Sequence, residues 1–201
     1  MKIGPRFKIA KRLGAPIFEK TQTQKFALSE ARGGKNKKRR TQMSDYKRQL
    51  LEKQKMRLTY GITEKQLRRY VDEAFDKSRT PIIYLMVRLE RRLDNVAYRM
   101  GLAKTRRLAR QMVSHGHLTV NGRKVTIPSY SVKTDDTIAV RNGSRESSLF
   151  LSLSETHEPA SVPNWLTFDS KKLTGNIKSE PMTDLSELLF DPAQVLEYYS
   201  R

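Results

Sequence analysis

The chain has 201 residues, of which 37% are hydrophobic, and this length allows one large domain or two smaller domains with modest cores. Its formal net charge of +19 attracts polyanions, so nucleic acid or an anionic membrane surface is the expected class of partner. The chain has no cysteines, which excludes disulfides, thiolate nucleophiles and thiolate metal sites.

The positive charge lies in the first three-quarters of the chain. Residues 1–60 carry 18 Lys and Arg against 4 Asp and Glu, residues 61–145 carry 18 against 8, and residues 146–201 carry 4 against 9. We therefore expect the ligand surface before residue 146. The sequence contains no apolar run long enough to predict a transmembrane helix. Its first residues lack the apolar stretch of a secretory signal. Because the cations are spread over several predicted elements, a membrane-surface role is not favoured.

Residues 1–42 are predicted to form an extended basic arm. Its last part, ARGGKNKKRRTQ (residues 31–42), has too few apolar residues to fold alone. It is either a solvated tail or an arm that becomes ordered on RNA, and the charge of the chain favours the second interpretation.

Two amphipathic helices are predicted next. Ser44 is a suitable N-cap for a helix that stops at Gly61. Thr63 and Gln66 fit the capping box of a second helix that ends near Ser78. The apolar face of this second helix consists of Leu67, Tyr70, Val71, Ala74 and Phe75.

Two further helices are each predicted to have one apolar and one basic face. The third helix runs from Thr80–Pro81 to Gly101, and the fourth runs from the N-cap Thr105 to Gly116. The polar stripe of the third helix, which has no acid of its own, consists of Arg88, Arg91, Arg92, Asn95 and Arg99. Asp94 lies just off this stripe and could brace one of its arginines. The polar face of the fourth helix consists of Arg106, Arg107, Arg110, Gln111 and Ser114.

A β segment is predicted after the fourth helix. Asn121–Gly122 suits a type I′ turn and predicts a hairpin of two short strands. Further strands are predicted at Thr137–Val140, at residues 148–154 and as a pair within residues 163–177. Residues 184–201 are predicted to be partly helical and to dock their apolar residues on the basic body.

His115 and His117, on either side of Gly116, are candidates for a metal site. Zinc needs three or four ligands, and the remaining histidine, His157, lies in a predicted polar loop. We favour a role at the corner between helix and hairpin, where these histidines pack and donate hydrogen bonds to phosphate or ribose. The adjacent Asp135–Asp136 pair is expected in a turn.

The sequence lacks the common catalytic motifs, so it gives no support for an enzyme. The patterns G-x-S-x-G, H-E-x-x-H and G-x-x-x-x-G-K-[ST] do not occur in the chain. We expect no catalytic residues, no metal, no cofactor and no small-molecule substrate. Basic helical faces interleaved with Asn, Gln, Thr and His instead favour contacts with RNA phosphates and 2′-hydroxyls.

The stretch RLERRLDNVAYRMGLAKTRRLARQMVSHGHLTVNGRKVTIPSYSVKTDDTIAV (residues 88–140) closely resembles the S4 RNA-binding domain. The resemblance continues in GPRFKIAKRLG, LLEKQKMRLTYG, VPNWLTFD and the terminal EYYSR. Taken together and in order, these motifs resemble the bacterial-type ribosomal protein S4 family of the small subunit over nearly the whole chain.

The resemblance implies an α+β protein in which an S4 domain, with helices on a small and mostly antiparallel sheet, is inserted into a helical domain. The expected parts are a basic arm (1–42), a helical domain (43–87 with 182–201) and an S4-type domain (88–181, core 88–145). The family further implies a cytoplasmic primary binder of 16S ribosomal RNA. This binder nucleates the small-subunit body at a multi-helix junction of the 5′ domain. It also contacts ribosomal protein S5 near the mRNA entrance, where it influences decoding accuracy.

Carried onto this sequence, the resemblance nominates residues of both domains for RNA binding. In the S4-type domain they are Arg92, Asn95, Arg99, Thr105, Arg106, Arg110, Gln111, His115, His117, Asn121, Arg123 and Lys124. In the helical domain they are Lys53, Lys55, Arg57 and Tyr60. Some family members bind zinc through four cysteines in the N-terminal arm. This chain lacks them, so RNA contacts or the arm's own packing must order it.

Two rival classes remain open at this point. S4 domains are also appended to RNA-modifying enzymes such as pseudouridine synthases, but the rest of this chain is already assigned and leaves no room for a catalytic domain. Stress-response ribosome-binding S4 proteins are usually shorter, and they would not explain WLTFD or EYYSR.

Overall fold

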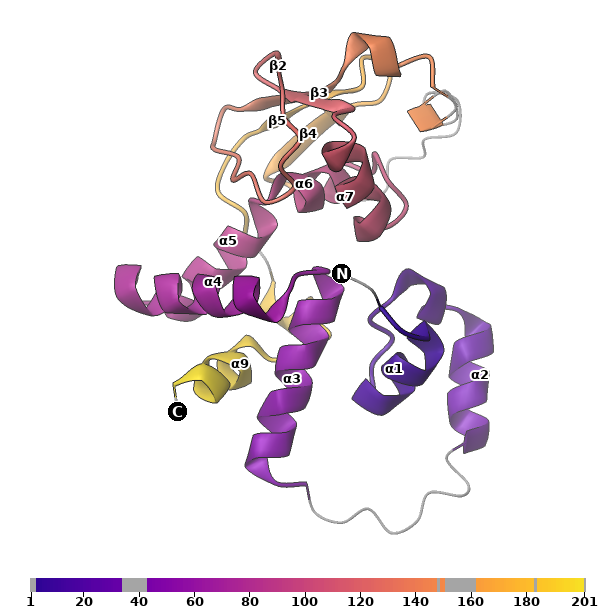
Figure 1. Ribbon diagram of the computed structural model, residues 1–201, viewed down its shortest axis with the longest axis vertical. Helices are drawn as coiled ribbons and strands as arrows, with labels where there is room; N and C mark the ends of the chain where they lie inside the picture. Colours follow the sequence, from indigo (N-terminus) through magenta and orange to yellow (C-terminus); the bar gives the residue numbers. More distant parts are fainter. Residues whose placement is uncertain (1–2, 34–42, 148, 151–161, 183, 201) are drawn as a thin grey trace. The chain divides into compact units, whose positions relative to one another are not determined.

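The computed structural model describes residues 3–33, 43–147, 149–150, 162–182 and 184–200. The chain divides into two compact units (Figure 1). One unit combines residues 1–85 with residues 184–201, and the other consists of residues 86–183. The second unit is therefore an insertion in the first.

The N-terminal part of the first unit is helical rather than extended. It contains α1 (Arg6–Leu13), η1 (Glu19–Thr21) and α2 (Gln24–Gly33). Its buried residues form a cluster of Ala10, Leu13, Ala15, Ile17, Phe18 and Phe26. Half-buried Leu51 and Leu58 pack against this cluster. The prediction of an extended arm was therefore wrong for residues 3–33, because burial of these apolar side chains offsets the cost of ordering the chain. Residues 34–42 lie outside the described part.

Three helices form the rest of the first unit: α3 (Asp45–Thr59), α4 (Glu64–Lys77) and α9 (Pro192–Tyr199). The predicted N-caps are confirmed, since Ser44 Oγ accepts from Lys47 N–H and Thr63 Oγ1 accepts from Gln66 N–H. A short turn, η4 (Leu185–Glu187), precedes α9. Helix α9 packs on α3 and α4, so the predicted helical C-terminal segment docks within its own unit (Figure 1).

The predicted third helix is two helices, α5 (Pro81–Glu90) and α6 (Leu93–Arg99). Between them Arg92 is extended and forms an antiparallel bridge with Ser131. Leu93 N–H donates to Tyr130 O at 2.9 Å, and Val132 N–H donates to Arg91 O at 2.9 Å. The prediction of one continuous helix was wrong because these long-range backbone bonds replace helical ones, which periodicity alone does not reveal.

Helix α7 (Arg106–Ser114) leads into a five-stranded antiparallel sheet of order β2-β1-β3-β5-β4. The strands are β1 (Leu118–Val120), β2 (Arg123–Lys124), β3 (Thr137–Val140), β4 (Leu166–Asp169) and β5 (Thr174–Ile177). A turn, η3 (Asn142–Ser144), follows β3. The hairpin prediction is confirmed, with φ of 49° at Asn121 and 78° at Gly122 as a type I′ turn requires. The strand predicted at residues 148–154 is wrong where it is described, since Leu149 and Phe150 are helical.

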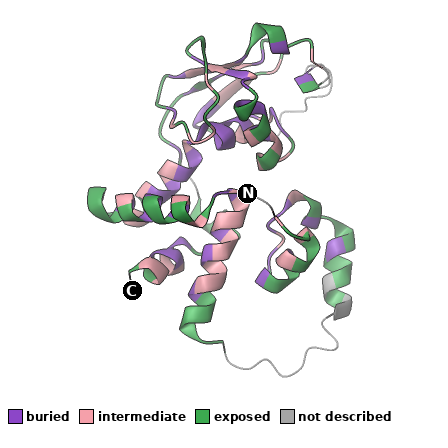
Figure 2. Ribbon diagram, in the orientation of Figure 1, coloured by how far each residue is buried: buried purple, intermediate pink, exposed green. Residues whose placement is uncertain are grey.

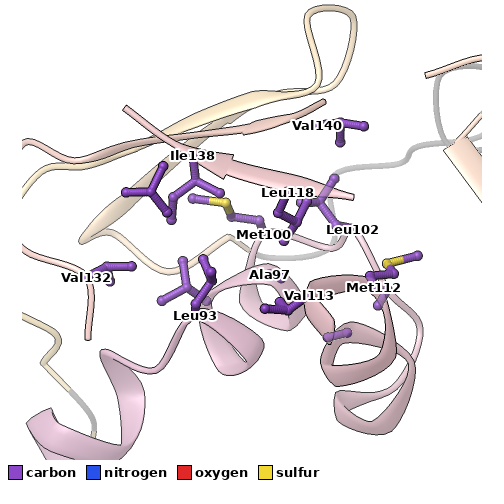
Figure 3. Close-up of a cluster of buried hydrophobic side chains, with 14 of the residues drawn as sticks. Leu93, Ala97, Met100, Leu102, Met112, Val113, Leu118, Val132, Ile138 and Val140 are labelled. Atoms are coloured by element: carbon purple, nitrogen blue, oxygen red, sulfur yellow. The ribbon is translucent and has the colours of Figure 1, made fainter. Parts of the chain in front are cut away.

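The core of the inserted unit lies between one face of the sheet and helices α6 and α7 (Figure 3). Leu93 and Ala97 of α6, Met100 directly after α6, and Val113 of α7 lie in this layer. Buried residues are concentrated in this layer, whereas exposed residues line the hairpin and the outer side of α7 (Figure 2). The fold is therefore α+β, as the sequence predicts.

Gly175 of β5 packs closely against strand β4 and Met100. A Cβ at this position would lie 2.6 Å from the Thr167 carbonyl oxygen and 2.7 Å from Met100 Cε. We expect Gly175→Ala to destabilise the inserted unit by about 1–3 kcal/mol, because strand β4 must shift to accept the methyl group. Urea unfolding followed by the fluorescence of the single tryptophan, buried Trp165, measures this effect.

A matched control is available in the same unit. Gly143→Ala adds a Cβ that meets nothing within 4 Å. We expect this variant to unfold with the wild-type midpoint. Equal midpoints for the Gly175 and Gly143 variants would show that β4 can shift to accept the methyl group without a loss of stability.

Candidate nucleic-acid interface

Helix α7 presents the polar face that its sequence predicts. Thr105 caps the helix by accepting from Leu108 N–H at 3.1 Å, so its hydroxyl serves the fold. Arg107 and Gln111 are exposed, and Arg106 and Arg110 are half-buried. The opposite side of the helix is fixed in the core by Ala109, Met112 and Val113.

A buried carboxylate, Glu90, lies behind this face. It is 1% exposed and accepts from Asn95 Nδ2 at 2.8 Å. Its two oxygens also accept from Arg99 Nε at 3.0 Å and Arg99 Nη2 at 3.1 Å. A two-point bond of this kind holds the guanidinium in one orientation. Arg99 is therefore positioned by Glu90 while 31% of its side chain remains exposed.

A second buried carboxylate, Asp94, joins two arginines. Arg92 Nε and Nη2 donate to its two oxygens at 3.0 and 2.7 Å, and Arg110 Nη1 lies 3.8 Å from Oδ2. Arg92 is 1% exposed. The expectation that Asp94 braces an arginine of this surface is confirmed.

Arg106 is held flat on the surface. Its Nε donates to Asn95 Oδ1 at 2.8 Å, and its guanidinium lies 4.4 Å from the centre of the Tyr98 ring. Asn95 thus links Glu90 to Arg106, and it is itself buried. A cation on an aromatic face keeps its orientation without losing its charge.

The predicted acid-free stripe of the third helix was therefore wrong. The break at Arg92 turns this residue and Asn95 inward, where Asp94 and Glu90 hold them. Neither Arg92 nor Asn95 is placed to touch a large ligand. Both instead support Arg99, Arg106 and Arg110 from behind.

The β1–β2 hairpin brings a second set of cations to the surface. Arg123 and Lys124 are exposed. Asn121 is also exposed, but its side chain is engaged, since Nδ2 donates to Asp136 Oδ1 at 2.8 Å and Oδ1 accepts from Thr137 N–H at 2.9 Å. Asp135 has a φ of 68°, as expected of a turn residue.

The two histidines flank the corner between α7 and β1. His115 is exposed and His117 is half-buried, with their ring centres 5.9 Å apart. His117 Nδ1 shares a hydrogen bond of 3.0 Å with Ser144 Oγ. Burial, together with the positive charges of His115, Arg141 and Lys124, lowers the pKa of the His117 imidazole below its usual value.

The four candidates of the helical unit are engaged within that unit. Lys53 is 5% exposed, donates to Glu64 Oε1 at 2.6 Å and lies 4.2 Å from the centre of the Tyr198 ring. Lys55 donates to Glu52 at 2.7 Å, and Arg57 donates twice to Gln54 Oε1. Tyr60 is buried and packs edge-on against Phe190. The structure does not bring these four together as an exposed basic patch.

Glu64 is the centre of this network. Burial would raise its pKa, but hydrogen bonds from Lys53 and Tyr199 outweigh that effect and lower the pKa. Burial and the bond to Glu64 raise the pKa of Tyr199. The terminal tyrosines that the sequence showed as EYYSR thus tie α9 to α3 and α4.

The structure adds exposed cations that the sequence did not single out as contacts. Arg107 belongs to the polar face of α7, and its place on the helical wheel is a signal that could have found it. Arg141 reaches the corner because its N–H donates to His117 O at 2.8 Å. Only strand pairing shows this proximity, since the two residues are far apart in sequence. Within the described ranges, no cluster of three or more His, Asp or Glu side chains is placed to bind a metal. No described helix has the length and apolar character needed to cross a bilayer.

Two family models match the chain. The model described as S4 domain matches residues 91–138, and the model described as Ribosomal protein S4/S9 N-terminal domain matches residues 1–82. Similar full-length proteins carry the name small ribosomal subunit protein uS4. The one from Persephonella marina is 44% identical over 98% of both chains. Those from Roseiflexus castenholzii and Chromobacterium violaceum are 45% and 41% identical, each over 99% of this chain and 98% of the relative.

Proposed function

The chain belongs to the uS4 family of small ribosomal subunit proteins, and on that premise we propose that it is a primary 16S ribosomal RNA-binding protein that nucleates assembly of the small-subunit body. It is a structural ribosomal protein and not an enzyme. Its ligand in this proposal is a multi-helix junction of the 5′ domain.

The observation that carries this proposal is the exposed basic surface of the inserted unit. Arg107 and Gln111 on α7 and Arg123 and Lys124 on the hairpin project from a rigid core. Side chains of this kind bind phosphates and 2′-hydroxyls and recognise RNA shape more than sequence. Arg99, Arg106 and Arg110 add charge in orientations set by buried polar side chains. We assign Arg92, Asn95, Thr105 and Asn121 to positioning.

A second part of the proposal concerns neighbouring components of the ribosome. We propose that the protein contacts ribosomal protein S5 and lies near the mRNA entrance, where this contact influences decoding accuracy. The full-length similarity to uS4 proteins supports this role. Co-sedimentation with small subunits, followed by crosslink mapping, tests it. Recovery of transfer RNA, or of no RNA at all, would contradict a position in the small subunit near the mRNA entrance.

The RNA surface makes a quantitative prediction. We expect the double substitution Arg107→Ala and Arg123→Ala to weaken binding to a 16S 5′-domain fragment, because each exposed cation neutralises about one phosphate. The log–log salt slope should fall by about one unit for each cation removed. Filter binding or fluorescence titration at several salt concentrations measures both quantities.

A matched control removes the same charge elsewhere in the unit. Lys172 and Lys178 are exposed and flank β5, and strands β1 and β3 lie between β5 and β2. Lys172→Ala with Lys178→Ala should leave the slope near the wild-type value. Equal losses for the two double variants would indicate a diffuse attraction by net charge and no defined surface.

A further inference from the structure

The corner between α7 and β1 gathers four basic side chains from separate segments. The chain turns there through Gly116, which has a φ of 72° and lies between His115 and His117. His115 is at the C-cap of α7, Lys124 is on β2, and Arg141 directly follows β3. His115, Lys124 and Arg141 are exposed, and His117 is half-buried.

Gly116 lets the lysine lie against this corner. A Cβ at position 116 would overlap with Lys124 Cε and would lie 3.0 Å from its Nζ. Any side chain here would displace Lys124, and the positive φ also favours glycine. The ammonium group is therefore placed beside the backbone that joins the two histidines.

His117 is held in one orientation by its neighbours. Its Nδ1 bonds Ser144 Oγ at 3.0 Å, and its ring packs edge-on against Phe150 at 6.0 Å between centres. Its backbone carbonyl accepts from Arg141 N–H at 2.8 Å. In the tautomer in which Nδ1–H donates to Ser144 Oγ, Nε2 carries no proton and can take one up.

Within the described part of the chain, the charges that act on His117 are positive. They come from His115 on α7, Arg141 after β3 and Lys124 on β2, while Ser144 and Phe150 are uncharged. These cations and burial lower the pKa of His117 and hold its ring neutral. An anion that binds among them cancels this repulsion and favours protonation.

We propose that His115, His117, Lys124 and Arg141 form a binding site for one phosphate group, and that its occupation takes up a solvent proton at His117 Nε2. The proposal rests on the proposed RNA-binding function, and it assigns to this corner one phosphodiester of the bound RNA. The proton converts the neutral imidazole to a cation that donates a hydrogen bond to a phosphate oxygen. RNA binding is therefore stronger in mildly acid solution.

The direct test follows the histidine ring protons of the intact protein by NMR between about pH 5.5 and pH 8. The titration is repeated with sulfate, a tetrahedral oxyanion that stays doubly charged in this window, and with the 16S 5′-domain fragment. We expect both ligands to move the His117 titration to higher pH. A His117 curve that neither ligand shifts would overturn the proposal.

The second test measures RNA affinity against pH at fixed salt. For wild type, one proton gives a gain of at most about tenfold for each pH unit between the bound-state pKa and the lower free-state pKa. In His117→Asn, which keeps a polar group beside Ser144, the affinity should no longer rise as the pH falls. The Lys172→Ala and Lys178→Ala control should keep the wild-type pH dependence.

The outcomes separate the two proposals. Tight RNA binding with the same affinity at all pH values would overturn the proton-linked site and leave the RNA-binding function intact. A pH dependence that persists unchanged in His117→Asn would do the same. Failure of the wild-type protein to bind the fragment at any pH would contradict the proposed function itself.

Discussion

Asp94→Ala is expected to destabilise the inserted unit by about 3–5 kcal/mol, the largest effect of any single polar substitution proposed for it. Asp94 is the carboxylate to which Arg92 Nε and Nη2 donate, at 3.0 and 2.7 Å. Arg92 is 1% exposed, so loss of this carboxylate takes two charge-assisted hydrogen bonds and the balancing negative charge from a buried guanidinium. Arg110 also loses its contact with Asp94. Urea unfolding monitored by Trp165 measures the loss, because this tryptophan is buried in the same core.

Two control variants separate the buried pair from a general effect of charge. Glu146→Ala removes the same charge from an exposed position of the same unit and should shift stability by less than about 0.5 kcal/mol. Replacing the pair together, as Arg92→Met with Asp94→Leu, should recover most of the lost stability, because no buried charge then remains. A single Asp94→Ala variant as stable as Glu146→Ala would contradict the assignment of Asp94 as a structural partner.

Local signals in the sequence predicted the elements whose structure depends on near neighbours. The caps at Ser44, Thr63 and Thr105 are examples, since each hydroxyl accepts from an N–H three residues away. The Asn121–Gly122 turn is another, because few residues adopt positive φ at both central positions. The polar face of α7 followed from helical periodicity alone.

Contacts distant in sequence account for the predictions that were wrong. Arg92 falls on the basic stripe by periodicity, yet its bridge to Ser131 breaks the helix and buries it. Lys53 looks like a surface cation, yet it bonds Glu64 and packs on Tyr198 from the far end of the chain. In each case the cation is buried by a partner distant in sequence. Helical periodicity does not identify that partner. Charge at a position therefore does not by itself show whether the side chain is exposed.

The same distinction explains the N-terminal segment. The sparse apolar content of residues 31–42 favoured an extended arm, but Phe18 and Phe26 earlier in the chain help to form a cluster with α1. Phe7 and Phe26 have ring centres 5.8 Å apart, which adds aromatic contact to this packing. For residues 3–33, the arm's own packing is the alternative that the structure supports.

Phe190→Ala is expected to destabilise the helical unit by about 3–5 kcal/mol. Phe190 is 5% exposed and lies just before α9, with its ring centre 6.3 Å from that of buried Tyr60 at the end of α3. Truncation leaves a cavity where the two ends of this discontinuous unit meet. The free energy of opening, measured by amide hydrogen exchange in α3 and α9, should fall by this amount, whereas Trp165 fluorescence should report an unchanged inserted unit.

The neighbouring residue provides the control, and the position of Tyr60 connects the result to RNA binding. Leu189 is 40% exposed, so Leu189→Ala should change opening of the helical unit much less than Phe190→Ala does. Tyr60 was predicted as an RNA contact, but its buried ring makes Tyr60 a packing partner of Phe190. Tyr60→Phe should therefore leave the affinity for the 16S 5′-domain fragment unchanged. A loss of affinity in Tyr60→Phe with unchanged hydrogen exchange would instead assign its hydroxyl to the RNA, because packing by the ring alone predicts no loss of affinity.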